Sequence, residues 1–113
     1  MEVRDALPVE QVPTVRLARW RVYETVDSGH RHFAGHNPDL GIHRVSSAIT
    51  AYDPVLRRGR TESGRVYELL GEPALEPDAD AERAWQVWCA LNGVPASFDV
   101  THEYVVAPPK TLH

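Results

Sequence analysis

Residues 78–92 carry the pattern that most constrains the fold of this chain. Asp78 is a favourable N-cap, and Asp80 and Glu82 place negative charge at the positive end of a helix dipole. Gly93 then supplies the left-handed residue that commonly ends a helix. These local signals agree, so the sequence predicts a helix over residues 78–92.

Apolar side chains form one stripe along this helix. They recur three and four positions apart, at Ala81, Ala84, Trp85, Trp88 and Leu91. A buried tryptophan removes about 200 Å² of surface from water. We therefore expect the helix to lie on a sheet or on a partner.

Most of the remaining chain alternates apolar and polar residues, as half-buried strands do. The expected strands are residues 15–24, 30–36, 42–52, 56–61 and 65–70, with a weaker one within 97–106. Leu17 and Ala18 break the alternation and indicate a bulge. Even spacing and short polar turns favour an antiparallel meander. The predicted fold is thus α+β: an antiparallel β-meander of five or six strands with one C-terminal amphipathic helix packed on it, either as an open sheet or as a small, partly closed barrel.

The bulk properties suit a single small domain. The chain has 113 residues, of which 42% are hydrophobic and 25% charged, which are globular averages. We expect one domain over residues 14–106, a loose N-terminal arm over 1–13 and a frayed tail over 107–113. A lone cysteine excludes an internal disulfide and suits a reducing, cytoplasmic location. The N-terminus lacks the apolar core of a signal peptide, and no apolar run is long enough to span a membrane.

Charge is distributed unevenly along the chain. The net charge is −4, yet nine arginines face five acidic residues between Arg16 and Arg65, whereas seven acidic residues face Arg83 and Lys110 from Glu72 onward. This asymmetry is compatible with a nucleic-acid-binding face. It is equally compatible with attraction between the two parts of the fold, which we favour.

Four histidines lie within fourteen residues: His30, His32, His36 and His43. The spacing of His30 and His32 puts both on one strand face. Neutral imidazoles clustered in this way can hold zinc or nickel. His30, His32 and His36 are therefore candidate metal ligands, although surface histidines that titrate near neutrality are the commoner case.

The register between two strands decides whether these histidines converge. A symmetric turn sets His36 opposite His43, whereas a slip of one residue flips every side chain. The slipped register joins Phe33 to Val45 and Ile49 in the core. On packing grounds we expect the slipped register, with His43 pointing away.

Arginines and tyrosines interleave along the expected strands, and a sheet face of this composition can stack bases and track phosphates. The candidate nucleic-acid-binding residues are Arg21, Tyr23, Arg44, Arg58, Arg60, Arg65 and Tyr67. However, arginine is also normal on exposed strands, where charge prevents edge-to-edge aggregation. The sequence pI of 5.8 further departs from the basic character of a dedicated binder.

Catalytic patterns are weak. Cys89 lies within the helix, where a thiol usually serves packing. Ser46, His43 and Asp53 supply the residue types of a triad without a nucleophile elbow. No phosphate-binding loop or dinucleotide fingerprint is present. We therefore expect no enzyme and no cofactor.

Three runs in the sequence resemble a group of small bacterial proteins that are often encoded near mobile elements. They are W-R-V-Y-E at 20–24, R-V-S-S-A-I at 44–49 and T-E-S-G-R-V-Y-E-L-L-G at 61–71. No activity is assigned to that group, so the resemblance implies a bacterial accessory protein and transfers no site residue.

The leading functional prediction is a non-enzymatic binding or regulatory module that engages another protein or a second copy of itself. Features that stabilise a fold are abundant, and a small sheet offers edges for pairing. The alternatives are nucleic-acid binding through the arginine and tyrosine face, and metal binding by the histidines.

Overall fold

The computed structural model describes residues 12–74 and 79–105. Its elements in chain order are β1 (Thr14–Thr25), β2 (Arg31–Asn37), β3 (Ile42–Val45), β4 (Ile49–Asp53), β5 (Arg58–Thr61), β6 (Val66–Leu70), α1 (Ala79–Asn92), β7 (Ser97–Asp99) and α2 (His102–Val105). The domain is α+β, as predicted. Within the described residues, neither helix is both long and apolar enough to cross a membrane.

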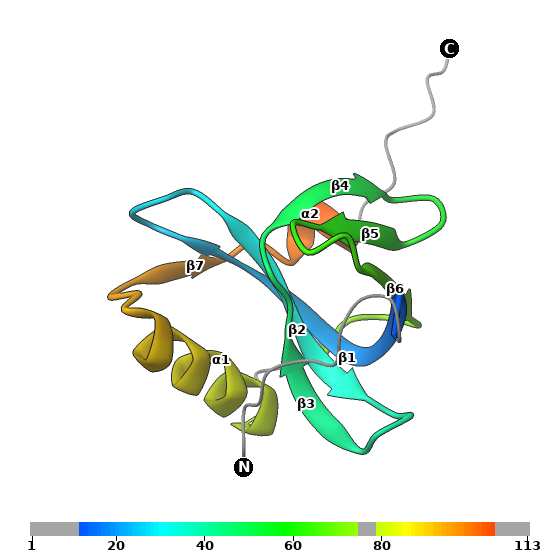
Figure 1. Cartoon of the computed structure of the whole chain (residues 1–113), viewed down its shortest axis with the longest axis horizontal. Coiled ribbons are helices and arrows are strands. Elements are labelled where there is room, and N and C mark those ends of the chain that lie inside the picture. The colour runs from blue at the N-terminus through cyan, green and yellow to red at the C-terminus, as the bar shows by residue number, and fades with distance from the viewer. Residues whose placement is uncertain (1–11, 75–78, 106–113) are drawn as a thin grey trace.

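The sheet is mixed, so the prediction of a purely antiparallel meander was wrong. Its strand order is β3-β2-β1-β6-β5-β4, with β7 added to β1, and the β1–β6 pair is parallel. The hairpins β1–β2, β2–β3, β4–β5 and β5–β6 each reverse the chain, but β3 continues into β4 through a bend. Because the chain reverses four times between β1 and β6, the two strands run in the same direction and pair in parallel. The sheet is not closed, because β3 and β4 end the order on opposite sides (Figure 1).

A bend at residues 46–48 divides the strand that was predicted over 42–52. Ser46 is buried and exchanges two hydrogen bonds with Phe33: the Ser46 N–H donates to the Phe33 carbonyl at 2.8 Å, and the Ser46 Oγ accepts from the Phe33 N–H at 2.9 Å. The Ser46 hydroxyl also donates to the Ser47 carbonyl at 2.7 Å. Side-chain bonds of this kind compete with a regular ladder. The chain therefore leaves β2 at Ser46 and pairs with β5 as β4.

This bend overturns the expected histidine register. His36 pairs with His43, so the slipped register was wrong. Val45 pairs with Ala34, whereas Ile49 packs against the core that contains Phe33. In a straight strand Val45 and Ile49 would share one face. Because of the bend, Val45 and Ile49 need not share a face, and Phe33 is buried without a slipped register between β2 and β3.

The long strand β1 has three partners. Its first half pairs with β6 and its last three residues pair with β7, while β2 runs along the other edge. The register with β2 shifts between Ala18 and Arg21, and Arg19 has a φ of 50°. The expected bulge therefore lies just beyond Leu17 and Ala18. Bulges increase local strand twist, which fits the change of partner from β6 to β7 at this point.

The inner face of the curled sheet holds the main core. Its buried members are Val15, Leu17, Trp20, Val22, Phe33, Tyr67, Leu69, Val100 and Tyr104. The last predicted strand, 97–106, is confirmed over Ser97–Asp99 and wrong over residues 100–105; residue 106 lies outside the described residues. The Asp99 carboxylate accepts from the Thr101 N–H at 2.9 Å, and the Val100 carbonyl accepts from the Glu103 N–H at 3.0 Å. This turn begins α2, which places Tyr104 in the core.

The helix prediction is confirmed over Ala79–Asn92, with the expected N-cap Asp78 outside the described residues. Gly93 has a φ of 68°, and the Val94 N–H donates to the Cys89 carbonyl at 2.9 Å, which ends the helix in a Schellman motif. α1 lies outside the curled sheet and packs against β2 and β3 (Figure 1). Leu91 is 68% exposed, so the apolar stripe extends beyond the contact.

Packing begins slightly before the predicted domain start at residue 14. Val12 packs against the core, and the Pro13 carbonyl accepts from the Val66 N–H at 2.9 Å. The rest of the predicted arm, residues 1–11, lies outside the described residues, as do residues 106–113, which include the predicted tail.

Candidate partner-binding groove

A layer of stacked rings joins α1 to the outer face of the sheet. Trp85 lies between Tyr23, at 4.7 Å between ring centroids, and Trp88, at 5.1 Å, and both pairs are nearly parallel. His32 packs against Trp88 at 4.5 Å. The Trp85 indole N–H donates to the Ser97 hydroxyl at 2.9 Å. Residues of β1, β2, α1 and β7 thus meet at Trp85, which is buried.

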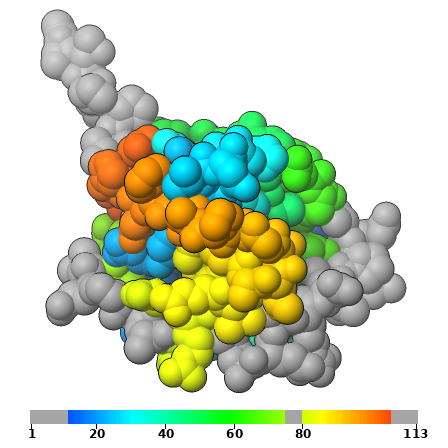
Figure 2. Space-filling view, turned by 90° about the vertical axis from the view of Figure 1, so that its left-hand side faces the viewer, coloured from blue at the N-terminus to red at the C-terminus, as the bar shows by residue number. Residues whose placement is uncertain are grey.

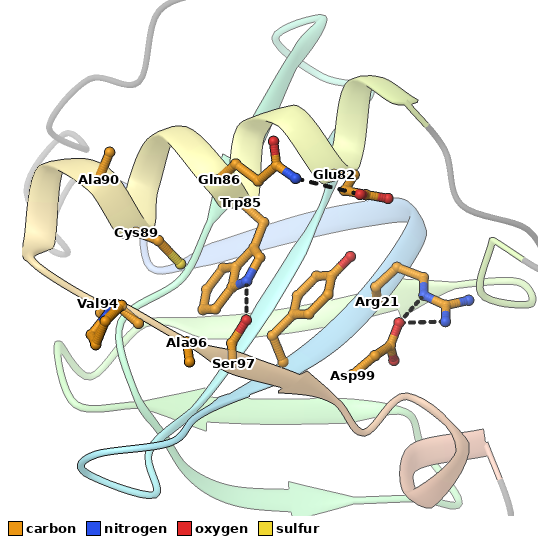
Figure 3. Close-up of a pocket in the computed structure, with 12 residues that line it drawn as sticks. Arg21, Glu82, Trp85, Gln86, Cys89, Ala90, Val94, Ala96, Ser97 and Asp99 are labelled. Atoms are coloured by element: carbon orange, nitrogen blue, oxygen red, sulfur yellow. Dashed lines mark hydrogen bonds and ion pairs between the residues drawn. The ribbon is translucent and has the colours of Figure 1, made fainter.

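Beside these rings, a groove of about 550 Å³ separates α1 from β7. Trp85, Cys89 and Ala90 line its helical side, and Val94 and Ser97 line the side that leads into β7. The Trp85 indole points into the space between the two elements (Figure 3). Aromatic and aliphatic atoms on the one hand and polar atoms on the other therefore contribute similar shares of the groove surface.

One end of the groove is charged. Arg21 donates to the Asp99 carboxylate from Nε at 3.0 Å and from Nη2 at 2.5 Å, and Glu82 accepts from the Gln86 amide at 3.4 Å (Figure 3). Burial raises the pKa of Asp99, but hydrogen bonds from Thr101 and Arg21 outweigh it and hold that pKa below its ordinary value. Asp99 is thus a carboxylate at neutral pH.

Two groups with nucleophilic potential in the groove are kept protonated. Burial, together with the charge of Asp99, raises the pKa of Tyr23 to about 12. Burial also raises the pKa of the Cys89 thiol. A neutral phenol and a neutral thiol suit contact with a ligand better than covalent chemistry.

The groove adjoins an unpaired strand edge. The Ala96 carbonyl accepts from the Val26 N–H at 3.1 Å, and the Val100 N–H donates to the Val22 carbonyl at 2.8 Å. Backbone groups alternate in direction along a strand, so the N–H and C=O groups of Ser97 and Asp99 point away from β1. In the described part of the chain, β7 pairs with β1 alone.

The histidines predicted as metal ligands occupy separate environments. His30 is exposed in the β1–β2 turn. His32 is buried, its Nδ1 lies 2.9 Å from the Ser46 carbonyl, and burial lowers its pKa. The rings of His36 and His43 lie 5.3 Å apart. Among residues 12–74 and 79–105, no group of three or more histidine, cysteine, aspartate or glutamate side chains is placed to hold a metal.

Three of the residues predicted to bind nucleic acid lie in or against the interior. Tyr67 is 1% exposed in the core. Arg44 donates to the Tyr67 hydroxyl at 3.1 Å. Arg65 is also buried, and its Nε donates to the Val12 carbonyl at 2.8 Å. These side chains support the fold and are not displayed together on a surface.

The other four predicted residues are divided between two places. Arg58 and Arg60 are exposed on β5, and Arg58 pairs with Glu68 at 2.8 Å. Arg21 and Tyr23 lie at the groove. The seven residues therefore do not form one arginine and tyrosine face.

The uneven charge distribution is matched by some of the ion pairs. Early arginines pair with late acidic residues in three ion pairs: Arg21–Asp99 at 2.5 Å, Arg31–Glu103 at 2.9 Å and Arg57–Glu72 at 3.3 Å. Two other ion pairs, Arg16–Asp39 and Arg31–Glu24, lie within the basic part, so attraction between the two parts accounts for only some of the pairing.

Sequence reasoning missed the groove residues Gln86, Ala90, Ser97 and Asp99. None carries a local signal, because their role arises from contacts across most of the chain. Asp99, for example, meets Arg21 from 78 positions away.

Comparison with known proteins adds no relative: no family model matches the chain, and neither a curated protein nor a solved structure is significantly similar to it.

Proposed function

We propose that this chain is a non-enzymatic binding module that engages another protein through the groove between α1 and β7. The observation that carries the proposal is the groove itself, which combines aromatic and aliphatic side chains with polar ones and lies beside an unpaired strand edge. Binding sites commonly combine an apolar pocket with a few fixed polar groups. Here Arg21 and Asp99 hold each other in place and supply those groups.

Exposed apolar side chains around β7 support a protein as the ligand. Phe98 is 58% exposed and Val26 is 48% exposed. Phe98 pairs with Glu24 and lies on the face of the sheet opposite to Ser97 and Asp99. Val26 directly follows β1, and its N–H donates to the Ala96 carbonyl beside β7. A partner at β7 thus has apolar contacts on both sides of the strand, whereas a small ligand in the groove contacts one side only.

The proposal is tested by selecting peptides from a random display library on the immobilised protein and measuring their affinity for two variants. Ala90→Arg places a bulky charge in the groove, and Leu91→Arg places the same charge one position along, outside it. We expect Ala90→Arg to weaken binding at least about tenfold and Leu91→Arg to leave it unchanged. A selection that yields no binder, or binders that tolerate Ala90→Arg, contradicts the proposal.

A bacterial origin and a cytoplasmic location remain predictions from the sequence. They fit a module with a single free thiol, since Cys89 takes part in no disulfide.

A further inference from the structure

The outer edge of β7 presents hydrogen-bonding groups in the spacing of a strand. Ser97 and Asp99 each turn a backbone N–H and C=O away from β1, as the bonds of Ala96 and Val100 to β1 require. Phe98, between them, directs its backbone groups toward Glu24. Such an edge is a template for a further strand.

Side chains alternate across this edge in a way that suits an added strand. Ser97 and Asp99 face α1 and the groove, whereas the exposed Phe98 faces the opposite side. The segment that contains β7 lies beside α1 on one open face of the molecule (Figure 2). Alternate residues of an added strand therefore reach the groove and Phe98 in turn.

Charge around β7 is net negative on both faces. On the groove side the charged residues are Glu82, Asp99 and Arg21. On the opposite side they are Glu24, Arg31 and Glu103, linked by ion pairs of 2.8 and 2.9 Å. Each face thus carries two carboxylates and one guanidinium. This excess of carboxylate favours a basic partner.

We propose that the partner supplies an extended basic segment that adds to the outer edge of β7 as a further strand of the sheet. This inference rests on the proposed function and specifies how the groove is used. The backbone bonds of Ser97 and Asp99 provide affinity. Side chains on one face of the added strand make the apolar contacts, with the groove or with Phe98, and the carboxylates on the opposite face select lysine or arginine.

The test is amide hydrogen exchange, followed by nuclear magnetic resonance, on the whole chain with a short peptide that alternates lysine with valine. We expect exchange at Ser97 and Asp99 to slow at least about tenfold when the peptide binds. Exchange at Phe98, whose N–H already faces β1, should not change, which provides an internal control. A matched peptide that alternates glutamate with valine should bind at least about tenfold more weakly, and the difference should shrink with added salt.

The outcomes separate this inference from the proposed function. If the lysine peptide binds and perturbs Ala90 but leaves exchange at Ser97 and Asp99 unchanged, strand addition is wrong while the groove remains a binding site. If neither this peptide nor a library-selected peptide binds, both proposals are wrong. If both amides are already protected in the free protein, a second copy or another segment of the chain occupies the edge, and the inference is overturned.

Discussion

Gly59→Ala tests the packing of the core where the backbone of β5 meets the ring of Phe33. A Cβ at Gly59 would lie 2.4 Å from Cζ and 2.6 Å from Cε2 of Phe33. Phe33 is fully buried, with its ring centroid 6.0 Å from that of Tyr52, 5.7 Å from that of Tyr67 and 6.2 Å from that of Tyr104. The Phe33 ring therefore has little room to move away.

Two opposing effects set the magnitude. Gly59 has no positive φ, so an alanine there is free of backbone strain and by itself stabilises by about 0.4–1 kcal/mol, because it restricts the unfolded chain. Overpacking opposes this and costs about 1–3 kcal/mol. The Phe33 ring must move by about 1 Å to restore carbon–carbon contacts of about 3.5 Å, so we use the upper end of that range. The expected net loss of unfolding free energy is about 2 kcal/mol.

Urea unfolding of a double-mutant cycle measures this effect. In a Phe33→Leu background the ring is absent, and Gly59→Ala should become neutral or slightly stabilising. The coupling between the two sites should therefore be about 2 kcal/mol. Equal effects of Gly59→Ala in both backgrounds, or a stabilising effect in the parent protein, would refute the packing of Phe33 against Gly59.

Three further predictions concern the ring layer. Trp85→Ala should lower the free energy of unfolding by about 3–5 kcal/mol in urea titrations, whereas Trp85→Phe, which retains a ring and loses the bond to Ser97, should cost clearly less. Because burial lowers the pKa of His32, folded-state stability should be full above its ordinary value of 6.5 and decline as the pH falls below it; His32→Gln should flatten that decline in thermal melts. Because the pKa of Tyr23 is raised to about 12, its protonated phenol should stabilise the folded state below pH 10, and this stabilisation should be lost as the pH rises toward 12. The ultraviolet titration of Tyr23 should have a midpoint near 12, and a midpoint at 10 contradicts its burial under Trp85.

The elements that the sequence predicts well are those determined by neighbouring residues. The helix Ala79–Asn92 ends at Gly93 because that residue accepts a positive φ, and the stop is visible in the sequence. The hairpin strands are similarly marked by alternation and by turn residues such as Gly29 and Gly64, both of which have positive φ. Local chemistry suffices in these places.

The errors arise where distant residues decide. The bend at residues 46–48 depends on bonds from Ser46 to Phe33, thirteen positions away. Once the bend exists, the parallel β1–β6 pair follows, and the packing reason for expecting a slipped register between His36 and His43 disappears. Likewise, α2 replaces the end of a predicted strand because Tyr104 is buried in the core. Local alternation cannot signal such contacts.

The candidate site was predicted least well. Arg21 and Tyr23 were singled out, and both line the groove, but the other five residues of that set lie elsewhere. The groove is created by the position of α1 relative to β7, and the hydrogen bond from Trp85 to Ser97 joins these two elements. That arrangement is a property of the tertiary structure.

Binding of a partner between α1 and β7 can be followed directly through the indole N–H resonances of the tryptophans while a library-selected peptide is added. The Trp85 indole bonds Ser97 at the groove, whereas the Trp20 indole bonds the Gly71 carbonyl at 3.2 Å, away from it. We expect the Trp85 signal to shift in a saturable manner and the Trp20 signal to stay fixed. A Trp85 signal that stays fixed, while shifts gather at the exposed Val55 and Leu56 in the β4–β5 hairpin, would contradict binding between α1 and β7.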